Sequence, residues 1–261
     1  MATPVILYDN VLKTWPAPSN SGSILGANLP QNLTDGRDFT LYIYRGSGYG
    51  TSVLSYNITE AKTIDAWAYF VANISADSST IELSYTRSGV NTVITSATGA
   101  LKDQMRLLKF TPVDLQAGDV VKLSFSGDQM YVRQIYVGKA LEPPQGQYNS
   151  MTNPNNKPNM KINSVISRTG DVISRTIAKE ASDSNLEISH VTESWYRTYW
   201  EPFAVHAQRK PFFYLPDPLV DSDAVFSTAS AVVPGQPMGI GDLFSVKWKL
   251  SSIAKDSLYV L

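Results

Sequence analysis

The sequence predicts a mainly β protein, in which an N-terminal jelly-roll β-sandwich is followed by a C-terminal β-sandwich or open barrel with one helix. Three observations predict this class. Apolar and polar residues alternate in many segments, these segments are rich in Val, Ile, Thr and Tyr, and turn residues separate them. The chain has 261 residues, a length that suits two domains better than one.

The first half contains a series of segments with the two-residue period of β-strands. We expect strands at 39–44, 63–74, 81–87, 107–111, 120–125 and 131–137. The run 66–71 is apolar or aromatic at every position, which is typical of a strand that is buried on both faces. Turn residues such as Ser88-Gly89 and Gly118-Asp119 recur at the spacing of a sandwich. We therefore expect residues 1–141 to form one antiparallel sandwich.

A polar segment rich in Pro and Asn follows this predicted sandwich. Residues 142–160 include Pro143, Pro144, Pro154 and Pro158. Such a segment cannot bury much apolar surface, and its prolines oppose regular structure. We interpret it as an extended linker arm between domains 1–141 and 161–261, and the alternative is a long loop within one domain.

The second half begins with predicted strands and then changes period. Strands are expected at 161–167, 172–178, 185–191, 212–215, 225–233 and 244–253, with a hairpin turn at Thr169-Gly170. Between the third and fourth strands, Thr192 is a good helix N-cap, and Pro202 suits a first-turn position.

Five aromatic residues within nine positions mark this helix. Helical spacing places Trp195, Tyr199 and Phe203 on one inward face, and it leaves Tyr196 and Trp200 on a flank. Aromatic residues that are exposed on a flank usually mark an interface. Tyr196, Trp200 and the linker prolines are therefore our interface candidates, although a wider core contact explains the two aromatic residues equally well.

Composition and motifs argue against several function classes. The formal net charge is −1 with no basic excess in either half, so no nucleic-acid partner is expected. The absence of Cys excludes thiolate metal sites and a Cys nucleophile, and no apolar run is long enough to suggest membrane insertion. The two histidines, His190 and His206, are not spaced as metal ligands, and His206 reads as a packed histidine. No catalytic motif or assignable carboxylate pair is present, so we expect a protein that is not an enzyme.

The segment 32–37 is the best candidate for a ligand site. Asn32, Asp35 and Arg37 lie in a compact polar turn before a predicted strand. Oxygen atoms of Asn32 and Asp35 could bind calcium, which prefers such ligands. The alternative is a capped turn without metal. Apart from this structural calcium, no cofactor is expected.

Four segments resemble a known family. The residues 4–10, 32–37, 135–146 and 200–214 are similar to segments of siphophage-like distal tail proteins, which join a discoidin-like or galactose-binding-like sandwich to a C-terminal tail-protein domain. The resemblance implies a virion protein, made in the host cytoplasm, whose C-terminal domain forms a ring at the distal end of the tail. It implies a homohexamer that contacts the tail-tube protein and the baseplate hub protein, with the linker lying across a neighbouring subunit.

Two hypotheses about function follow. The first is a structural ring protein of the phage tail that connects the tail tube to the baseplate hub or fibres. The second is a carbohydrate-binding module of the tail tip that attaches the particle to a glycan on the host surface. The two are compatible, because an adhesive domain can sit on a ring.

Overall fold

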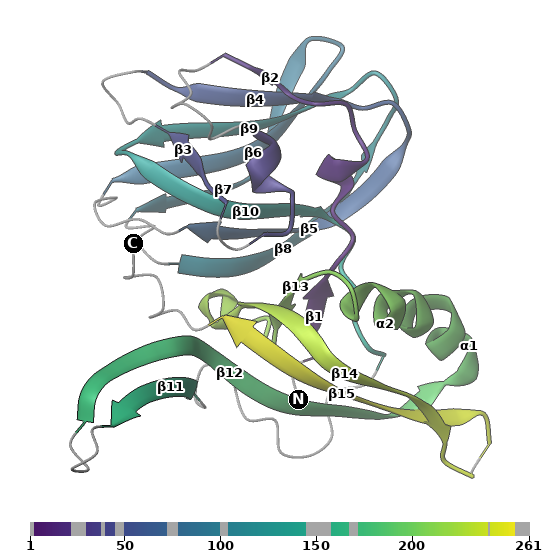
Figure 1. Cartoon of the computed structure of the whole chain (residues 1–261). Helices are drawn as coiled ribbons and strands as arrows, with labels where there is room; N and C mark the ends of the chain where they lie inside the picture. Colours follow the sequence, from purple (N-terminus) through teal and green to yellow (C-terminus); the bar gives the residue numbers. More distant parts are fainter. Residues whose placement is uncertain are drawn as a thin grey trace.

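The structure is a computed structural model that describes residues 3–21, 30–37, 40–44, 50–71, 78–99, 104–144, 158–166, 172–239 and 241–253. For 158–166 and 172–183 it describes the backbone alone. Antiparallel strands form three stacked sheets, with a short helical segment on the lowest sheet (Figure 1). The mainly β class that the sequence predicted is confirmed.

The two upper sheets form the predicted jelly-roll sandwich. The strands of the outer sheet are, in spatial order, β2 (Ser19–Asn20), β4 (Ser52–Asn57), β9 (Val120–Gly127), β6 (Ser79–Arg87) and β7 (Val90–Gly99). Those of the middle sheet are β3 (Tyr42–Tyr44), β10 (Met130–Gly138), β5 (Lys62–Val71) and β8 (Gln104–Leu115). Their inner faces enclose a core that includes Trp67, Leu123 and Phe125. The alternation of apolar and polar residues explains this packing, because successive side chains of a strand point to opposite faces.

The middle sheet is buried on both faces, as the run 66–71 predicted. Trp67 and Tyr69 of β5 point into the sandwich core. Ala66, Ala68 and Phe70 point the other way, into a second core that the middle sheet shares with the third sheet. The two halves of the chain are therefore joined by a continuous apolar contact.

The third sheet combines the N-terminal strand with the strands of the second half. Its spatial order is β1 (Val5–Leu7), β13 (Phe212–Leu215), β14 (Val225–Pro237), β15 (Leu243–Ile253), β12 (Val172–Thr192) and β11 (Pro158–Ile166). β1 pairs with β13, and Ile6 also forms an isolated bridge with Leu141. The predicted division at residue 141 is therefore wrong for β1. The strand β1 belongs to the third sheet because it is apolar on both faces. Val5 and Leu7 enter the core shared with the middle sheet, and Ile6 packs in the core on the helix side.

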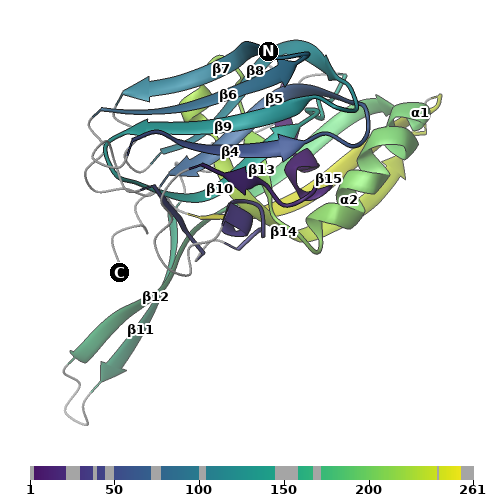
Figure 2. The ribbon, with the colours of Figure 1, turned by 90° about the horizontal axis from the view of Figure 1, so that it is seen from above.

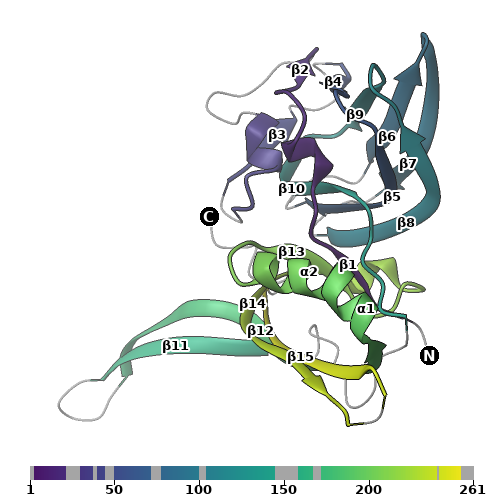
Figure 3. The same cartoon turned by 90° about the vertical axis from the view of Figure 1, so that its right-hand side faces the viewer.

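The strands β11 and β12 form a hairpin that projects from the body of the molecule (Figures 2 and 3). The predicted strands 172–178 and 185–191 are a single strand, because β12 runs without a break over 21 residues. The linker is also shorter than predicted, since Pro158 begins β11 and pairs with Ser182. Pro154 lies outside the described residues.

The helical segment has a different inward face from the predicted one. It consists of α1 (Glu193–Trp195), a π-helical turn (Tyr196–Trp200) and α2 (Glu201–Ala207). Trp200, Phe203 and Ala207 are buried against the third sheet, whereas Tyr199 is 48% exposed. The wider π turn adds one residue and so rotates the face that follows it. The predicted N-cap Thr192 accepts a hydrogen bond from Trp195 N, and Pro202 lies in the first turn of α2, as expected.

Candidate functional site

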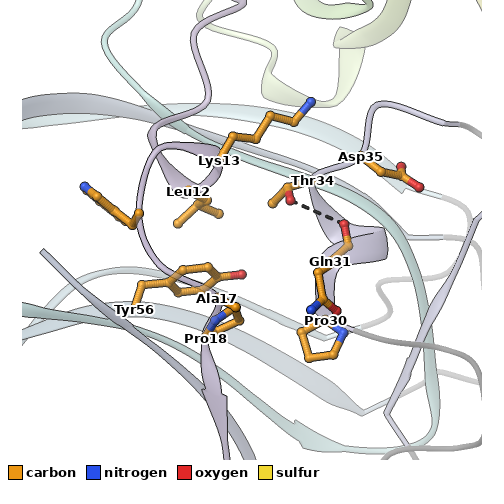
Figure 4. Close-up of a pocket in the computed structure, with 10 residues that line it drawn as sticks. Leu12, Lys13, Ala17, Pro18, Pro30, Gln31, Thr34, Asp35 and Tyr56 are labelled. Atoms are coloured by element: carbon orange, nitrogen blue, oxygen red, sulfur yellow. Dashed lines mark hydrogen bonds between the residues drawn. The ribbon is translucent and has the colours of Figure 1, made fainter. Parts of the chain in front are cut away.

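A cavity of about 410 Å³ opens beside the sandwich (Figure 4). Its walls come from three parts of the chain: residues 12–18, residues 30–35 and Tyr56 of β4. Small-molecule sites are usually clefts of about 300–1,000 Å³, so this cavity lies at the small end of that range.

Short 3-10 helices and buried amide groups hold the first two walls. Asn10 caps the helix Val11–Lys13, where its Oδ1 accepts from Leu12 N, and its Nδ2 donates to Ile135 O at 2.8 Å. Asn32, in the helix Pro30–Leu33, donates from Nδ2 to Leu41 O at 2.8 Å. The cavity walls are therefore tied to the middle sheet through Ile135 and to Leu41, the residue before β3.

Two buried aromatic side chains line the cavity and have unsatisfied polar atoms. Tyr56 is 2% exposed and Trp15 is 5% exposed, with their ring centroids 6.4 Å apart. Neither Tyr56 Oη nor Trp15 Nε1 has a hydrogen-bond partner in the described structure. The Tyr56 hydroxyl points into the cavity (Figure 4), and burial raises its pKa, which keeps it protonated. A buried donor without a partner costs free energy that a ligand could recover.

Polar side chains line the rest of the cavity. They are Lys13, Gln31, Thr34 and Asp35. Thr34 Oγ1 donates to the backbone oxygen of Gln31 at 3.3 Å, an interaction drawn as a dashed line in Figure 4. Amide and hydroxyl groups can donate and accept together, so this lining is suited to a ligand with several hydroxyl groups.

The predicted turn 32–37 forms one wall of this cavity, and a buried amide holds it. Gln134, which is fully buried, donates from Nε2 toward Asn32 O, Asp35 Oδ1 and Arg37 O at 2.7–3.2 Å. Gly36 N donates to Gln134 Oε1 at 3.1 Å. Asp35 also accepts from Arg37 N and Thr40 Oγ1. These are the contacts of a capped turn, the alternative that the sequence left open.

The calcium hypothesis finds a poor fit in this geometry. An amide nitrogen of Gln134 lies among the three oxygen atoms on which a cation would depend, and the Asn32 side chain is turned away toward Leu41. Among the described residues, no group of three or more His, Cys, Asp or Glu side chains could hold a metal ion. Structural calcium at this turn stays an untested hypothesis, and the contacts of the turn argue against it.

The other predicted site residues do not line this cavity. Trp200 is 1% exposed, so its predicted position on an exposed flank is wrong. Tyr196 is half-buried, stacks on Phe244 at a centroid distance of 5.1 Å and accepts a hydrogen bond from Gly235 N at 3.0 Å. Pro143 is buried within the chain, and Pro144 is exposed. The aromatic cluster of the helix is thus mainly a core contact, which was the alternative to an interface that the sequence left open.

His206 is a packed histidine, as expected. Its ring meets the Tyr8 ring edge-on at a centroid distance of 5.2 Å, and its Nε2 lies 3.3 Å from Pro211 O. Burial lowers the pKa of His206. Within the described ranges, no helix is long and apolar enough to cross a membrane.

The sequence pointed to the turn but missed the cavity. In the sequence, Leu12, Trp15 and Tyr56 look like any other apolar or aromatic residues of a core. The cavity walls also come from segments that are far apart in the sequence, and nothing in the sequence shows that these segments are neighbours. An unsatisfied hydroxyl is visible only when all surrounding atoms are placed.

The solved structures that are similar to this chain cover about half of it. No protein-family model matches the sequence, and no curated protein matches it. A pectin-binding carbohydrate-binding module is 16% identical, with 47% of this chain and 89% of that chain covered and a TM-score of 0.37. The family 32 module of NanJ from C. perfringens, in complex with galactose, is 17% identical, with 51% and 98% covered and a TM-score of 0.39.

A third similar structure is the CBM32 of AlyQ in complex with 4,5-unsaturated mannuronic acid. It is 21% identical, with 50% of this chain and 96% of that chain covered and a TM-score of 0.34. The tail-protein part of the sequence resemblance stays a prediction.

Proposed function

We propose that this chain is a non-catalytic carbohydrate-binding protein whose ligand site is the cavity between the residues 12–18, the residues 30–35 and Tyr56. The observation that carries the proposal is the buried Tyr56 hydroxyl, which points into the cavity without a partner. A saccharide hydroxyl can both accept from this group and donate to a neighbour.

The rest of the lining supports a saccharide over an apolar ligand. Aromatic walls favour the C–H faces of a sugar ring, and the Gln31 amide and the Thr34 hydroxyl can bind its hydroxyl groups. Binding is also a better proposal than hydrolysis. Among the described residues of the cavity lining, Asp35 is the one carboxylate, and glycoside hydrolysis commonly uses a pair of carboxyl groups.

Calorimetry on the intact chain, guided by a glycan array, tests this proposal. We expect Tyr56→Phe to weaken saccharide binding by about tenfold, the value of one hydrogen bond of about 1.4 kcal/mol. Tyr85→Phe is the matched control, because Tyr85 lies on β6 outside the cavity. A folded chain that binds no saccharide, or a Tyr56→Phe variant that binds as the wild type does, would contradict the proposal.

A second candidate function is assembly into a phage tail, and the projecting hairpin favours it. The residues 172–180 of β12 pair with β11 on one side, and their pairing with β15 begins only at Ala181. Within the described structure, both long edges of this two-stranded ribbon lack a partner strand. An isolated two-stranded ribbon is marginally stable in water, so a further strand from a partner would stabilise it.

In this second proposal the partner strand belongs to another copy of the chain in a homohexameric ring, which contacts tail-tube and hub proteins of the virion. Light scattering and negative-stain imaging test it. We expect rings from the intact chain and monomers when the hairpin 158–182 is replaced by a short Gly-Ser turn. Monomers from the intact chain, with no association with tail-tube or hub protein, would argue against the proposal.

A further inference from the structure

The outer sheet of the sandwich ends in a long open strand, β7 (Figure 2). Among the described strands, β7 pairs with β6 alone. It has ten residues, none of them charged and none of them proline, and its Val90 and Val93 are exposed. Alternate residues of an edge strand direct their N–H and C=O groups away from the sheet. Such an edge can pair with a further strand.

The other three edges of the sandwich are protected against such pairing in the described structure. The edge strands β2 and β3 have only two and three residues. The edge strand β8 is long, but it contains Pro112, the charged residues Arg106 and Lys109, and an irregular register with β5. Short length, proline, charge and bulges are the devices by which sheets avoid edge pairing. Of these devices β7 has one, a bulge at Ile94.

The bulge lies at the middle of β7 and permits a symmetric pairing. The pairing with β6 skips Ile94, so the alternation of faces shifts by one position between Val93 and Thr95. When two β7 strands pair antiparallel about their midpoint, the residues 90–93 of one copy lie opposite the residues 96–99 of the other. Because of the shift, the residues that lie opposite each other belong to the same face, as an antiparallel ladder requires.

The composition of β7 favours a second copy of this chain as the partner. β7 offers no charge with which to select a strand of another protein. In the symmetric register, Val93 lies opposite Ser96 of the copy and Asn91 opposite Thr98, so no like charges oppose the pairing. The contact uses the same surface on both copies, and a twofold rotation therefore closes it as a dimer.

We infer that two copies of the chain associate through antiparallel pairing of their β7 strands, which joins two five-stranded outer sheets into one continuous sheet. This inference goes beyond both proposed functions. β7 lies outside the lining of the cavity and outside the projecting hairpin, so neither a saccharide nor a ring is needed for the dimer.

Sedimentation velocity of the intact chain over a range of concentrations tests the inference. We expect reversible association to a dimer. Val93→Lys should raise the Kd of this dimer by about tenfold, because it places a charge in each of the two symmetric pairs of Val93 and Ser96. Thr228→Lys is the matched control, because Thr228 is an exposed residue of β14 in the third sheet. A chain that stays monomeric, or a dimer that Val93→Lys leaves unchanged, overturns the inference.

Cysteine cross-linking tests the register and reports on β7 alone. The chain has no Cys, so two introduced thiols can form a disulfide only with each other or with those of a copy. Opposite Cα atoms of an antiparallel pair lie about 4.5–5.5 Å apart, which is within the reach of a disulfide. Val93→Cys/Ser96→Cys should therefore form a cross-linked dimer on a denaturing gel faster than the control Val93→Cys/Thr228→Cys. Equal rates for the two variants, or cross-linked species larger than a dimer as the main product, contradict the proposed pairing.

Discussion

Gln134 Nε2 lies 2.9 Å from Asp35 Oδ1, so that one fully buried amide holds a turn 99 positions away in the sequence. The same side chain accepts from Gly36 N through Oε1. The turn carries Thr34 and Asp35, which line the cavity. The geometry of the candidate site therefore depends on a residue of β10 that does not line it.

Replacing Gln134 by Ala should destabilise the fold and disturb the cavity. The change removes the hydrogen bonds of Gly36 N and Asn32 O to the amide, while Asp35 Oδ1 and Arg37 O keep Arg37 N and Thr40 Oγ1 as donors. Loss of a partner costs about 1–3 kcal/mol for a buried group. Urea unfolding measures the free energy, and saccharide titration measures the affinity. Gln116→Ala is the matched control, because the Gln116 side chain is exposed. Equal stability of the two variants would show that the turn does not depend on the amide.

Calcium should leave the stability of the wild-type chain unchanged. The Gln134 amide nitrogen lies among the oxygen atoms that a cation would need, and a nitrogen that donates hydrogen bonds is not a calcium ligand. Thermal unfolding with calcium and with a chelator measures this. A rise of the melting temperature with calcium in the wild type would revive the metal hypothesis, and Gln134→Glu is the informative companion, since it replaces that nitrogen by oxygen.

The ion pair of Arg87 and Asp119 should make the free energy of unfolding depend on pH in the acid range. Arg87 Nη2 lies 2.7 Å from Asp119 Oδ2, and this hydrogen bond, more than any other contact, lowers the pKa of the Asp119 carboxyl. A lowered pKa in the folded state stabilises the fold above the unfolded value of about 4, and this contribution is lost as the pH falls through the folded value.

Urea midpoints measured from neutral pH down to acid test this dependence. Asp119→Asn should flatten the acid part of the curve and lower stability at neutral pH. Asp217→Asn serves as control, because in the described structure the Asp217 carboxylate accepts an exposed hydrogen bond from Leu219 N and forms no ion pair. A curve for Asp119→Asn that matches the wild type would contradict the role of this pair.

The shared core should make the sandwich and the third sheet unfold together. Phe213 of β13 packs on Phe226 of β14 at a centroid distance of 4.9 Å and on Tyr136 of the middle sheet at 5.3 Å. Phe213→Ala should therefore cost about 3–5 kcal/mol, as for other buried Phe residues. Calorimetry should show one transition in the wild type. Two separate transitions in the wild type would mean that the shared core does not couple the halves.

The π turn predicts opposite effects for two neighbouring aromatic residues. Trp200→Ala should destabilise the fold by about 3–5 kcal/mol, because its ring packs on Trp248 at 4.6 Å and is buried. Tyr199→Ala should change stability by about 0.5 kcal/mol or less, because Tyr199 is exposed. Chemical unfolding of both variants measures the difference. The face that we expected from regular helical spacing predicts the reverse order.

Periodicity was sufficient where neighbouring residues decide the outcome. The run 66–71 predicted a strand buried on both faces, and Thr192 predicted the helix start, because both depend on local pattern and local hydrogen bonding. The inward face of the helix was not predictable in this way. A single π turn rotates all later residues, and regular spacing carries no sign of it.

The pairing of segments that are far apart in the sequence could not be predicted either. β1 is only three residues long, and nothing in Val5–Leu7 identifies β13 as its partner. The candidate site shows the same limit. The turn 32–37 was visible as a polar motif, but Gln134, Tyr56 and Pro211 join it only through the tertiary structure.

The pairing of β1 with β13 also sets an order of events during synthesis. Val5 pairs with Leu215, so β1 leaves the ribosome about two hundred residues before its partner strand exists. Until then the apolar residues of β1 and the lower face of the middle sheet have no third sheet to cover them. The sandwich must therefore pass through a stage with an uncovered apolar face, and that stage is where chaperone binding or aggregation of the nascent chain would act.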